Sequence, residues 1–276
     1  MKIKYETILG VIFLLVTAVF SGCINSDNVS AAEIKMFTLD SSIQINSYRF
    51  LMNMDIETDI GGSEMKMTAN ANGAVNVIDQ KMMMEMSSAI PGANDMELLY
   101  YVIEELIYMK MDYFGNEQWT KMNFSDYNVS WDTYDQMNMQ IDLLDYGEVE
   151  RLDDEIIDNT DCYVLKIIPD LDKLIEALLN QQGLGTGMVQ DVSYSDMVEE
   201  LSLKLWISKD DNLILKAYEY MLMKMSMFGY EYSMSFEIEI RFFDYNEPVI
   251  IELPEDAENS ISYQDYLLGM YSSPPA

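Results

Sequence analysis

The sequence has no histidine among its 276 residues and only two cysteines. Without histidine, the chain lacks the commonest general base and the imidazole of Ser-His and Cys-His nucleophile pairs. Nearly every zinc or iron site is excluded for the same reason. We therefore expect neither an enzyme nor a bound cofactor.

Basic residues are also scarce, because 16 Lys plus Arg stand against 48 Asp plus Glu, a formal net charge of −32. A field of that sign repels nucleic acid and anionic lipid headgroups, so nucleic-acid binding is not expected. Acidic chains can be disordered, but hydrophobic residues make up 49% of this one, and it has 19 Tyr and 10 Phe. The charge therefore indicates a solvated surface around a folded core.

The apolar run near the N-terminus, residues 8–20, is shorter than the roughly 20 residues that span a bilayer. Two lysines precede it, which is typical of a secretory signal. The small residues just before Cys23 resemble the lipobox of prokaryotic lipoproteins, although Phe20 stands where leucine is usual. The resemblance implies cleavage before Cys23, a diacylglyceryl group on its sulfur, and a domain anchored on the extracytoplasmic face of the cell membrane. Ordinary signal cleavage or an uncleaved anchor is the alternative, and either would also export the domain.

This reading of the N-terminus divides the chain. Residues 1–22 are predicted as signal peptide, 23–40 as a lipidated tether, 41–258 as a single domain and 259–276 as a C-terminal extension. With Cys23 acylated, no intramolecular disulfide is possible, and Cys162 is expected to be a small buried residue. Three glycosylation sequons, at residues 28–30, 123–125 and 128–130, matter only if the host glycosylates exported proteins.

The clearest pattern lies between residues 221 and 242, where Met, Tyr, Phe and Ile occupy every second position. Strict alternation predicts two antiparallel strands with one apolar and one polar face, and Gly229 supplies the backbone freedom for the turn. Similar patterns predict strands over residues 47–60, 65–77, 81–87, 98–103, 106–112, 117–123, 148–155, 162–168, 198–208 and 249–253, and over 213–220, which continues into the first strand of the hairpin.

Helices are predicted where apolar residues recur every three or four positions, over residues 130–146, 170–179 and 262–270. The fold class is therefore α+β and mostly β. We expect a single strongly curved antiparallel sheet of about ten strands, a half-barrel, with the first two helices covering its concave face.

Methionine is abundant, with 24 residues, about four times what average usage predicts for this length. Flexible methionine surfaces adapt to varied apolar partners. Because two helices cannot cover so large a concave face, we expect its apolar remainder to line a cavity for acyl chains. The alternative is that methionine merely fills an irregular core. The predicted ligand-binding residues are Met52, Met54, Met65, Met67, Met82, Met84, Met86, Met109, Met111, Met221, Met223, Met225, Met227, Tyr232, Met234 and Phe236.

Several short motifs occur in an order typical of one family. They are Tyr-Met-Lys at 108–110, Trp-Thr-Lys at 119–121, Cys-Tyr-Val-Leu at 162–165, and the segments 205–216 and 243–254. Over residues 40–258 the chain resembles exported lipoproteins of the LppX/LprG and LolA-like superfamily. The resemblance implies a half-barrel with helices across its open side and an apolar cavity that takes acyl chains of lipids or lipoproteins.

Three further features of the sequence allow other interpretations of its function. The acidic cluster at residues 153–161 lacks the glycine and the spacing of a calcium loop, so a solvated turn is favoured and no metal site is predicted. The adjacent carboxylates at 104–105 and 199–200 would point to opposite faces of a strand, unlike the paired acids of a glycosidase. Tyr, Trp and Met also mark protein interfaces, so a cell-surface interaction or structural module is the rival to a lipid binder.

The sequence therefore predicts a membrane-anchored extracytoplasmic lipoprotein that binds or carries an apolar ligand. Its expected partners are the membrane, through lipidated Cys23, and lipid or lipoprotein acyl chains.

Overall fold

The computed structural model describes residues 29–92, 95–113, 116–124, 130–144, 147–171, 197–227 and 230–272. Ala31–Ala276 forms one compact unit. The predicted signal peptide, Cys23, nearly all of the helix predicted at 170–179, and the turn at Gly229 lie outside the described residues.

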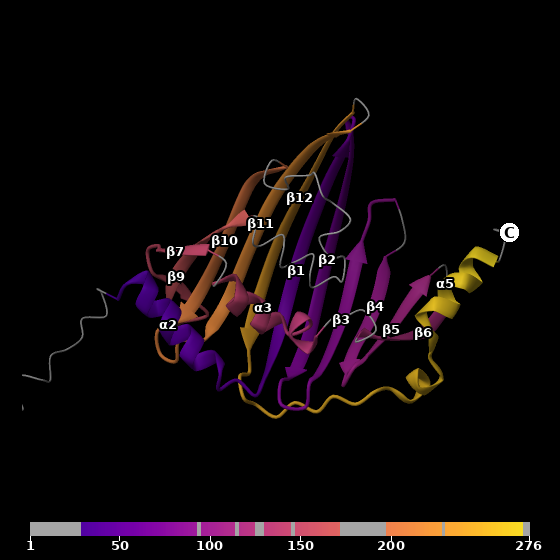
Figure 1. Cartoon of the computed structure of the whole chain (residues 1–276), viewed down its shortest axis with the longest axis horizontal. Helices are drawn as coiled ribbons and strands as arrows, with labels where there is room; N and C mark the ends of the chain where they lie inside the picture. The colour runs from indigo at the N-terminus through magenta and orange to yellow at the C-terminus, as the bar shows by residue number, and fades with distance from the viewer. Residues whose placement is uncertain are drawn as a thin grey trace, which may run out of the picture. The chain divides into compact units, whose positions relative to one another are not determined.

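In the part of the chain that the structure describes, thirteen strands form one sheet whose two edges, β13 and β7, do not meet (Figure 1). The pairing is antiparallel throughout, apart from the parallel pair of β13 with β6. The order is β13-β6-β5-β4-β3-β2-β1-β12-β11-β10-β9-β7, with β8 paired to β9. The strands are β1 Ser47–Ile60, β2 Ser63–Asn76, β3 Lys81–Ala89, β4 Met96–Ile103, β5 Leu106–Tyr113, β6 Asn116–Asn123, β7 Gly147–Arg151, β8 Glu155–Ile157, β9 Thr160–Pro169, β10 Val198–Ser208, β11 Ile214–Met227, β12 Tyr230–Phe243 and β13 Ile261–Ser262.

The mostly-β sheet is confirmed, with more strands than the ten or so predicted. The long hairpin becomes β11 and β12, and β12 pairs with β1, joining strands nearly 200 residues apart in the sequence. The strand predicted at 249–253 is wrong, because these residues form no ladder. They are extended, with Val249 and Ile251 buried and Ile250 84% exposed, so the alternation reflects burial of one side without strand pairing.

The helices in the described part of the chain are α2 Ala31–Ser42, α3 Gln136–Leu143 and α5 Tyr263–Ser272, with 3-10 turns η3 Trp131–Thr133 and η6 Glu255–Asn259. The terminal helix is thus confirmed. The helix predicted over 130–146 divides in two, because Asp135 is extended and caps α3. Helix α2 begins inside the range predicted as tether, so residues 31–40 belong to the folded unit, where Ile34 and Thr38 are buried.

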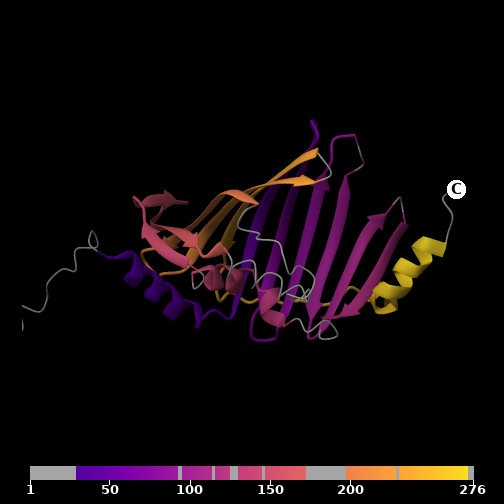
Figure 2. The same cartoon turned by 45° about the horizontal axis from the view of Figure 1, so that its top comes forward.

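The sheet has two chemically distinct faces, which follow from its register. Tyr48, Phe50 and Met52 of β1 lie opposite Val75, Gly73 and Ala71 of β2, and this side is called the inner face. Arg49, Leu51 and Asn53 lie on the other side, called the outer face. Helix α3 lies across the inner face (Figures 1 and 2).

The core of the molecule sits where α3 meets the inner face. The Tyr48 ring lies 6.4 Å from that of Phe50 and 5.8 Å from that of Phe242, measured between centroids. Phe50 lies over β2 because position 73 is glycine, since a Cβ there would come within 2.3 Å of the ring. Such close approach of a ring to a strand requires glycine at this position.

The two ends of the outer face are covered by other segments of the chain. Toward β6, Val249, Ile251 and Ala257 pack on Tyr101 and Trp119, forming the C-terminal outer cluster. Toward β9, Cys162, Val164 and Trp206 form the second outer cluster, with Leu152 and Ile157 packed against them. Cys162 is buried with a free thiol, as predicted.

Candidate functional site

All of the predicted ligand-binding positions fall on the inner face. In β1, Met52 and Met54 lie opposite Ile240 and Ile238 of β12. The same phase runs through the neighbouring strands: Met65 and Met67 in β2, Met82, Met84 and Met86 in β3, Met109 and Met111 in β5, Met221, Met223, Met225 and Met227 in β11, and Tyr232, Met234 and Phe236 in β12. The fold therefore brings these positions together on one side of one sheet.

Burial on the inner face falls off along the strands. Near α3 the face is closed, and Met82 is only 2% exposed. Most of the other predicted side chains that the structure describes are partly buried. Toward the tips of the β1–β2 and β3–β4 hairpins, Ile60, Met65 and Met96 are 52%, 55% and 42% exposed. The inner face therefore keeps accessible apolar surface beyond the region where α3 lies.

Helix α3 is fastened to the inner face at its N-terminus by a buried hydrogen-bond network. The hydroxyl of Tyr48 donates to Oδ1 of Asp135 at 2.6 Å, and the same oxygen accepts the backbone N–H groups of Met137 and Asn138 at 3.1 Å each. Burial raises the pKa of Asp135, and the bonds from Tyr48 and the two amides only partly oppose that shift. Asp135 thus caps the helix and attaches it to β1 at once.

A second polar contact joins the middle of α3 to β11. Gln140 is 2% exposed, and its Nε2 donates to Oε1 of Glu219 at 2.8 Å. Glu219 lies on the inner face between Leu203 and Ile238, with Met221 two residues further along its strand. Burial raises the pKa of the Glu219 carboxyl group, and the bond from Gln140 opposes the shift less strongly.

The other amide atom of Gln140 is unsatisfied. Its buried Oε1 has no hydrogen-bond partner among the described residues. A neutral Glu219 carboxyl group has an O–H to donate to this oxygen, which would close a two-bond acid–amide ring. An ionised carboxylate is acceptor-only and leaves the oxygen unpaired, so the geometry favours the protonated acid.

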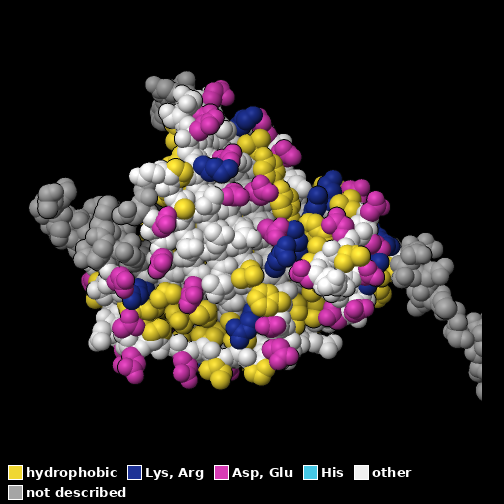
Figure 3. Space-filling model, turned by 180° about the vertical axis from the view of Figure 1, so that it is seen from behind, with side chains coloured by type: hydrophobic (Ala, Val, Ile, Leu, Met, Phe, Trp, Pro, Cys, Tyr) yellow, Lys and Arg dark blue, Asp and Glu magenta, His cyan; other side chains and the backbone are white. Residues whose placement is uncertain are grey.

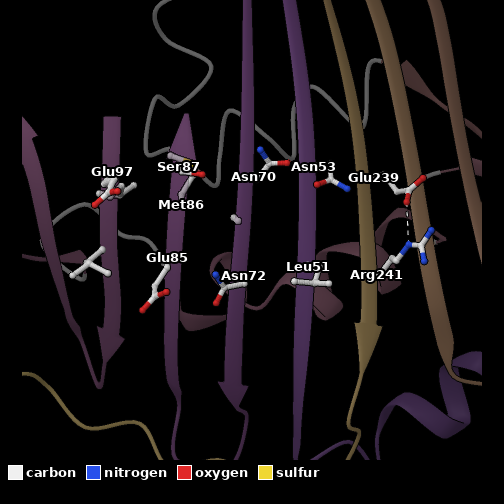
Figure 4. Close-up of a pocket in the computed structure, with 13 residues that line it drawn as sticks. Leu51, Asn53, Asn70, Asn72, Glu85, Met86, Ser87, Glu97, Glu239 and Arg241 are labelled. Carbon is white, nitrogen blue, oxygen red and sulfur yellow. Dashed lines mark hydrogen bonds and ion pairs between the residues drawn. The ribbon is translucent and has the colours of Figure 1, made fainter. Parts of the chain in front are cut away.

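The outer face carries a hollow of about 740 Å³ between the two outer clusters. Figure 3 shows this side of the molecule, with an area of neither charged nor hydrophobic side chains in its centre. Five neighbouring strands, from β12 to β4, contribute to the hollow (Figure 4). The residues that line it are Leu51, Asn53, Asn70, Ala71, Asn72, Glu85, Met86, Ser87, Glu97, Leu98, Leu99, Glu239 and Arg241.

The acidic and paired carboxylates that the sequence singles out do not assemble into a site. Among the described residues, no group of three or more His, Cys, Asp or Glu side chains is arranged to hold a metal ion. Asp154 of the acidic cluster pairs with Lys209 at 2.6 Å and with Arg151 at 2.9 Å. Glu104 occupies the β4–β5 turn with a positive φ of 56°, and Glu199 pairs with Lys224 at 2.7 Å.

Two features of these sites were not predicted from the sequence, although a sequence pattern indicates each of them. Glu219 stands in phase with the methionine run that begins at Met221, so it is an acid in a series of inner-face positions. Asn70 and Asn72 alternate with alanines in β2, in the phase opposite to the apolar positions. Asparagine is depleted in strands, so a repeated asparagine in a strand pattern points to its exposed face.

The sequence of this chain matches a known protein family. Residues 30–262 match the family described as "Family of unknown function (DUF6612)". No curated protein matches the sequence.

Solved structures similar to the chain include three bacterial proteins of low sequence identity. LprF from Mycobacterium bovis has 10% identity and a TM-score of 0.44, with 82% of this chain and 98% of that one covered. Lipoprotein LppX from Mycobacterium tuberculosis has 12% identity and a TM-score of 0.40, with 79% and 96% covered. A putative outer membrane lipoprotein-sorting protein domain from Vibrio parahaemolyticus has 10% identity and a TM-score of 0.26, with 83% and 97% covered. Lipoprotein LppX, after which the superfamily that the sequence motifs resemble is named, is thus among these structures.

None of the helices in the described part of the chain is both long and apolar enough to cross a membrane.

Proposed function

We propose that this chain, which belongs to the DUF6612 family of unknown function, is a membrane-anchored extracytoplasmic lipoprotein that binds or carries an apolar ligand on its inner face. The observation that carries the proposal is the accessible apolar surface beyond α3. Large side chains such as Ile60 and Met65 are more than half exposed there. A soluble protein rarely leaves such surface on a sheet face without a ligand or partner to cover it.

Energetics and side-chain chemistry favour an acyl chain as the occupant. Fully burying one Met or Ile side chain contributes about 1.5–3 kcal/mol, so covering several half-exposed ones offsets the cost of ordering a flexible ligand. Methionine side chains adapt to irregular apolar shapes. The wide, open inner face thus suits a long, flexible hydrocarbon better than a rigid, polar molecule.

The test is native mass spectrometry of residues 24–276, isolated gently after expression, followed by titration with a fluorescent acyl-chain probe. We expect co-purified lipid and a rise in the thermal unfolding midpoint when lipid is added. An apo mass alone, together with no thermal shift, would contradict the proposal. Self-association of the ligand-free domain would instead support the rival interaction module, in which a partner chain covers the inner face.

A matched pair of variants locates the binding surface. Met54→Gln places an amide in the middle of the inner face, whereas Leu222→Gln makes a comparable change on the outer side of β11, opposite Ser235. We expect only Met54→Gln to weaken probe binding, because a polar group among apolar ones must be desolvated without a partner. Equal loss in both variants would mean that the probe does not occupy the inner face.

The anchor is tested separately. Cys23→Ser should abolish incorporation of labelled palmitate and move the protein from the membrane fraction to the soluble fraction, because both acyl chains would be lost. Membrane association that persists in this variant would indicate an uncleaved signal anchor.

A further inference from the structure

The outer hollow differs from the rest of the outer face in being uncovered and, at its centre, uncharged. The two outer clusters cover the face toward β6 and β9. Elsewhere this face carries ion pairs, including Lys66 with Glu57 at 2.5 Å and Lys224 with Glu199 at 2.7 Å. In a chain of net charge −32, an area without charged side chains departs from the surrounding surface.

The register arranges the lining of the hollow in two rows that run across the strands. One row crosses five strands in the order Glu239, Asn53, Asn70, Ser87, Glu97. The second row runs parallel to it in the order Arg241, Leu51, Asn72, Glu85, Leu99. Amides and a hydroxyl therefore form the middle of the first row, with a carboxylate at each end, whereas the second row carries Arg241 at one end and Glu85 one strand from the other end (Figure 4).

The amide groups in the middle are exposed and available to a ligand. Asn53, Asn70 and Asn72 are all exposed. Among the residues drawn in Figure 4, the marked contact is the one between Nε of Arg241 and Oε1 of Glu239, 3.1 Å apart. An asparagine side chain offers two N–H donors and a carbonyl acceptor. The middle of the hollow thus presents donors and acceptors of no net charge.

We propose that the outer hollow binds a neutral, hydroxyl-rich saccharide chain. Amides match hydroxyl groups because both donate and accept, and the carboxylate of Glu97 accepts further hydroxyl protons at the β4 end. At the β12 end, Glu239 is already paired with Lys216 at 2.5 Å and with Arg241 at 3.1 Å. Leu51 and Leu99 in the second row supply apolar surface for the C–H side of a sugar ring. Because neighbouring strands lie about 4.8 Å apart, five strands span about 19 Å, which suits an oligosaccharide rather than a single sugar.

Charge and composition discriminate against other occupants. The net charge of −32 and the carboxylates of Glu85 and Glu97 in the lining disfavour nucleic acid and anionic glycans. The centre of a protein interface is enriched in aromatic and apolar side chains, whereas the described residues that line this hollow include three asparagines and a serine and no aromatic side chain. The carboxylates of the described residues do not gather into a metal site. This inference concerns the face opposite the proposed apolar site and does not depend on that site.

The experiment is isothermal titration of the purified full-length chain, in a detergent without sugar, against maltohexaose, cellohexaose, chitohexaose and a neutral mannan oligosaccharide. We expect saturable binding of at least one of these, with little dependence on salt, because no ion pair forms. The variant Asn53→Ala/Asn70→Ala/Asn72→Ala should bind at least about tenfold more weakly. Ser226→Ala, an exposed outer-face position at the far end of β11, should bind as the parent does.

The single variant Asn70→Asp provides a second measurement if the triple variant folds poorly. It keeps the shape of the side chain, removes both donors and adds a charge, so binding should again weaken. The proposal is overturned if no sugar binds the folded protein, or if the triple variant binds as tightly as the parent. Binding of a lysine-rich peptide that the triple substitution abolishes, without sugar binding, would also overturn it and identify a cationic partner.

Discussion

The Glu219–Gln140 contact predicts that α3 is held to the sheet more firmly in acid than at neutral pH. The folded protein raises the pKa of Glu219 by burial, so between the ordinary glutamate pKa of about 4.3 and the raised value the folded state binds more protons than the unfolded state. The stability that the raised pKa of Glu219 contributes is therefore fully present at low pH and is lost as the pH rises through that window. The slope cannot be steeper than about −1.4 kcal/mol per pH unit, the limit for one proton, and it returns to zero above the raised pKa.

The perturbation is Glu219→Gln. A glutamine at this position can accept from Nε2 of Gln140 and donate to its Oε1, so the pair keeps both bonds at every pH. We expect the variant to match the parent near pH 4 and to become increasingly more stable than the parent as pH rises. Glu219→Ala should instead be destabilised, because losing the acceptor leaves a buried polar group unpaired at a cost of about 1–3 kcal/mol.

The assay is urea unfolding followed by tryptophan fluorescence between about pH 4.5 and about pH 8, at constant ionic strength. The quantity of interest is the difference in unfolding free energy between parent and variant, because the many other carboxylates cancel in it. Glu64→Gln, at an exposed position of β2, is the matched loss of one charge. A parent-minus-variant difference that does not change with pH, or that changes equally for Glu64→Gln, would refute the reasoning.

Three further predictions follow from the packing. Gly73→Ala should destabilise the protein by about 1–3 kcal/mol in urea unfolding, because the new Cβ overlaps the Phe50 ring and lies 2.8 Å from the Met83 carbonyl oxygen. Partial recovery of stability in Gly73→Ala/Phe50→Leu would support the overlap with the ring, and an unchanged single variant would exclude it. Tyr48→Phe should lower the free energy of unfolding by about 1–3 kcal/mol, since Asp135 loses its 2.6 Å hydrogen bond inside the core. A loss below about 0.5 kcal/mol, within the usual range of surface substitutions, would contradict a stabilising role for this hydrogen-bond network. The Cys162 thiol, whose pKa burial raises, should react with Ellman's reagent only after unfolding, and rapid labelling of the native protein would contradict its burial.

Much of the secondary structure was predictable because strand alternation is a local property. The hairpin at 98–112 and the strand at 198–208 appear close to where the pattern predicts them. Residues 249–253 show the limit of that reasoning. Buried and exposed side chains do alternate here, since Val249 and Ile251 are buried in the C-terminal outer cluster. Such alternation shows which side chains are buried, but it does not show which backbone groups form hydrogen bonds with another strand.

The prediction of one helix over 130–146 failed for a related reason. The three-to-four spacing over 130–146 is continuous, yet the chain divides at Asp135. A carboxylate that accepts backbone N–H groups starts a new helix there, and the hydroxyl of Tyr48 makes that conformation favourable in the core. The decisive partner lies 87 residues away in the sequence, beyond the reach of a local pattern.

The amino-acid sequence by itself determined that the strands are two-sided and that most methionines occupy one phase of the strands that contain them, because side chains alternate with a period of two along any strand. Only the tertiary structure decided which phases share a face. That depends on register between distant strands, such as β1 with β12, and register is set by turns and core packing rather than by local sequence. The same cause explains why the contact of Gln140 with Glu219 and the rows of the outer hollow emerge only after the sheet is assembled.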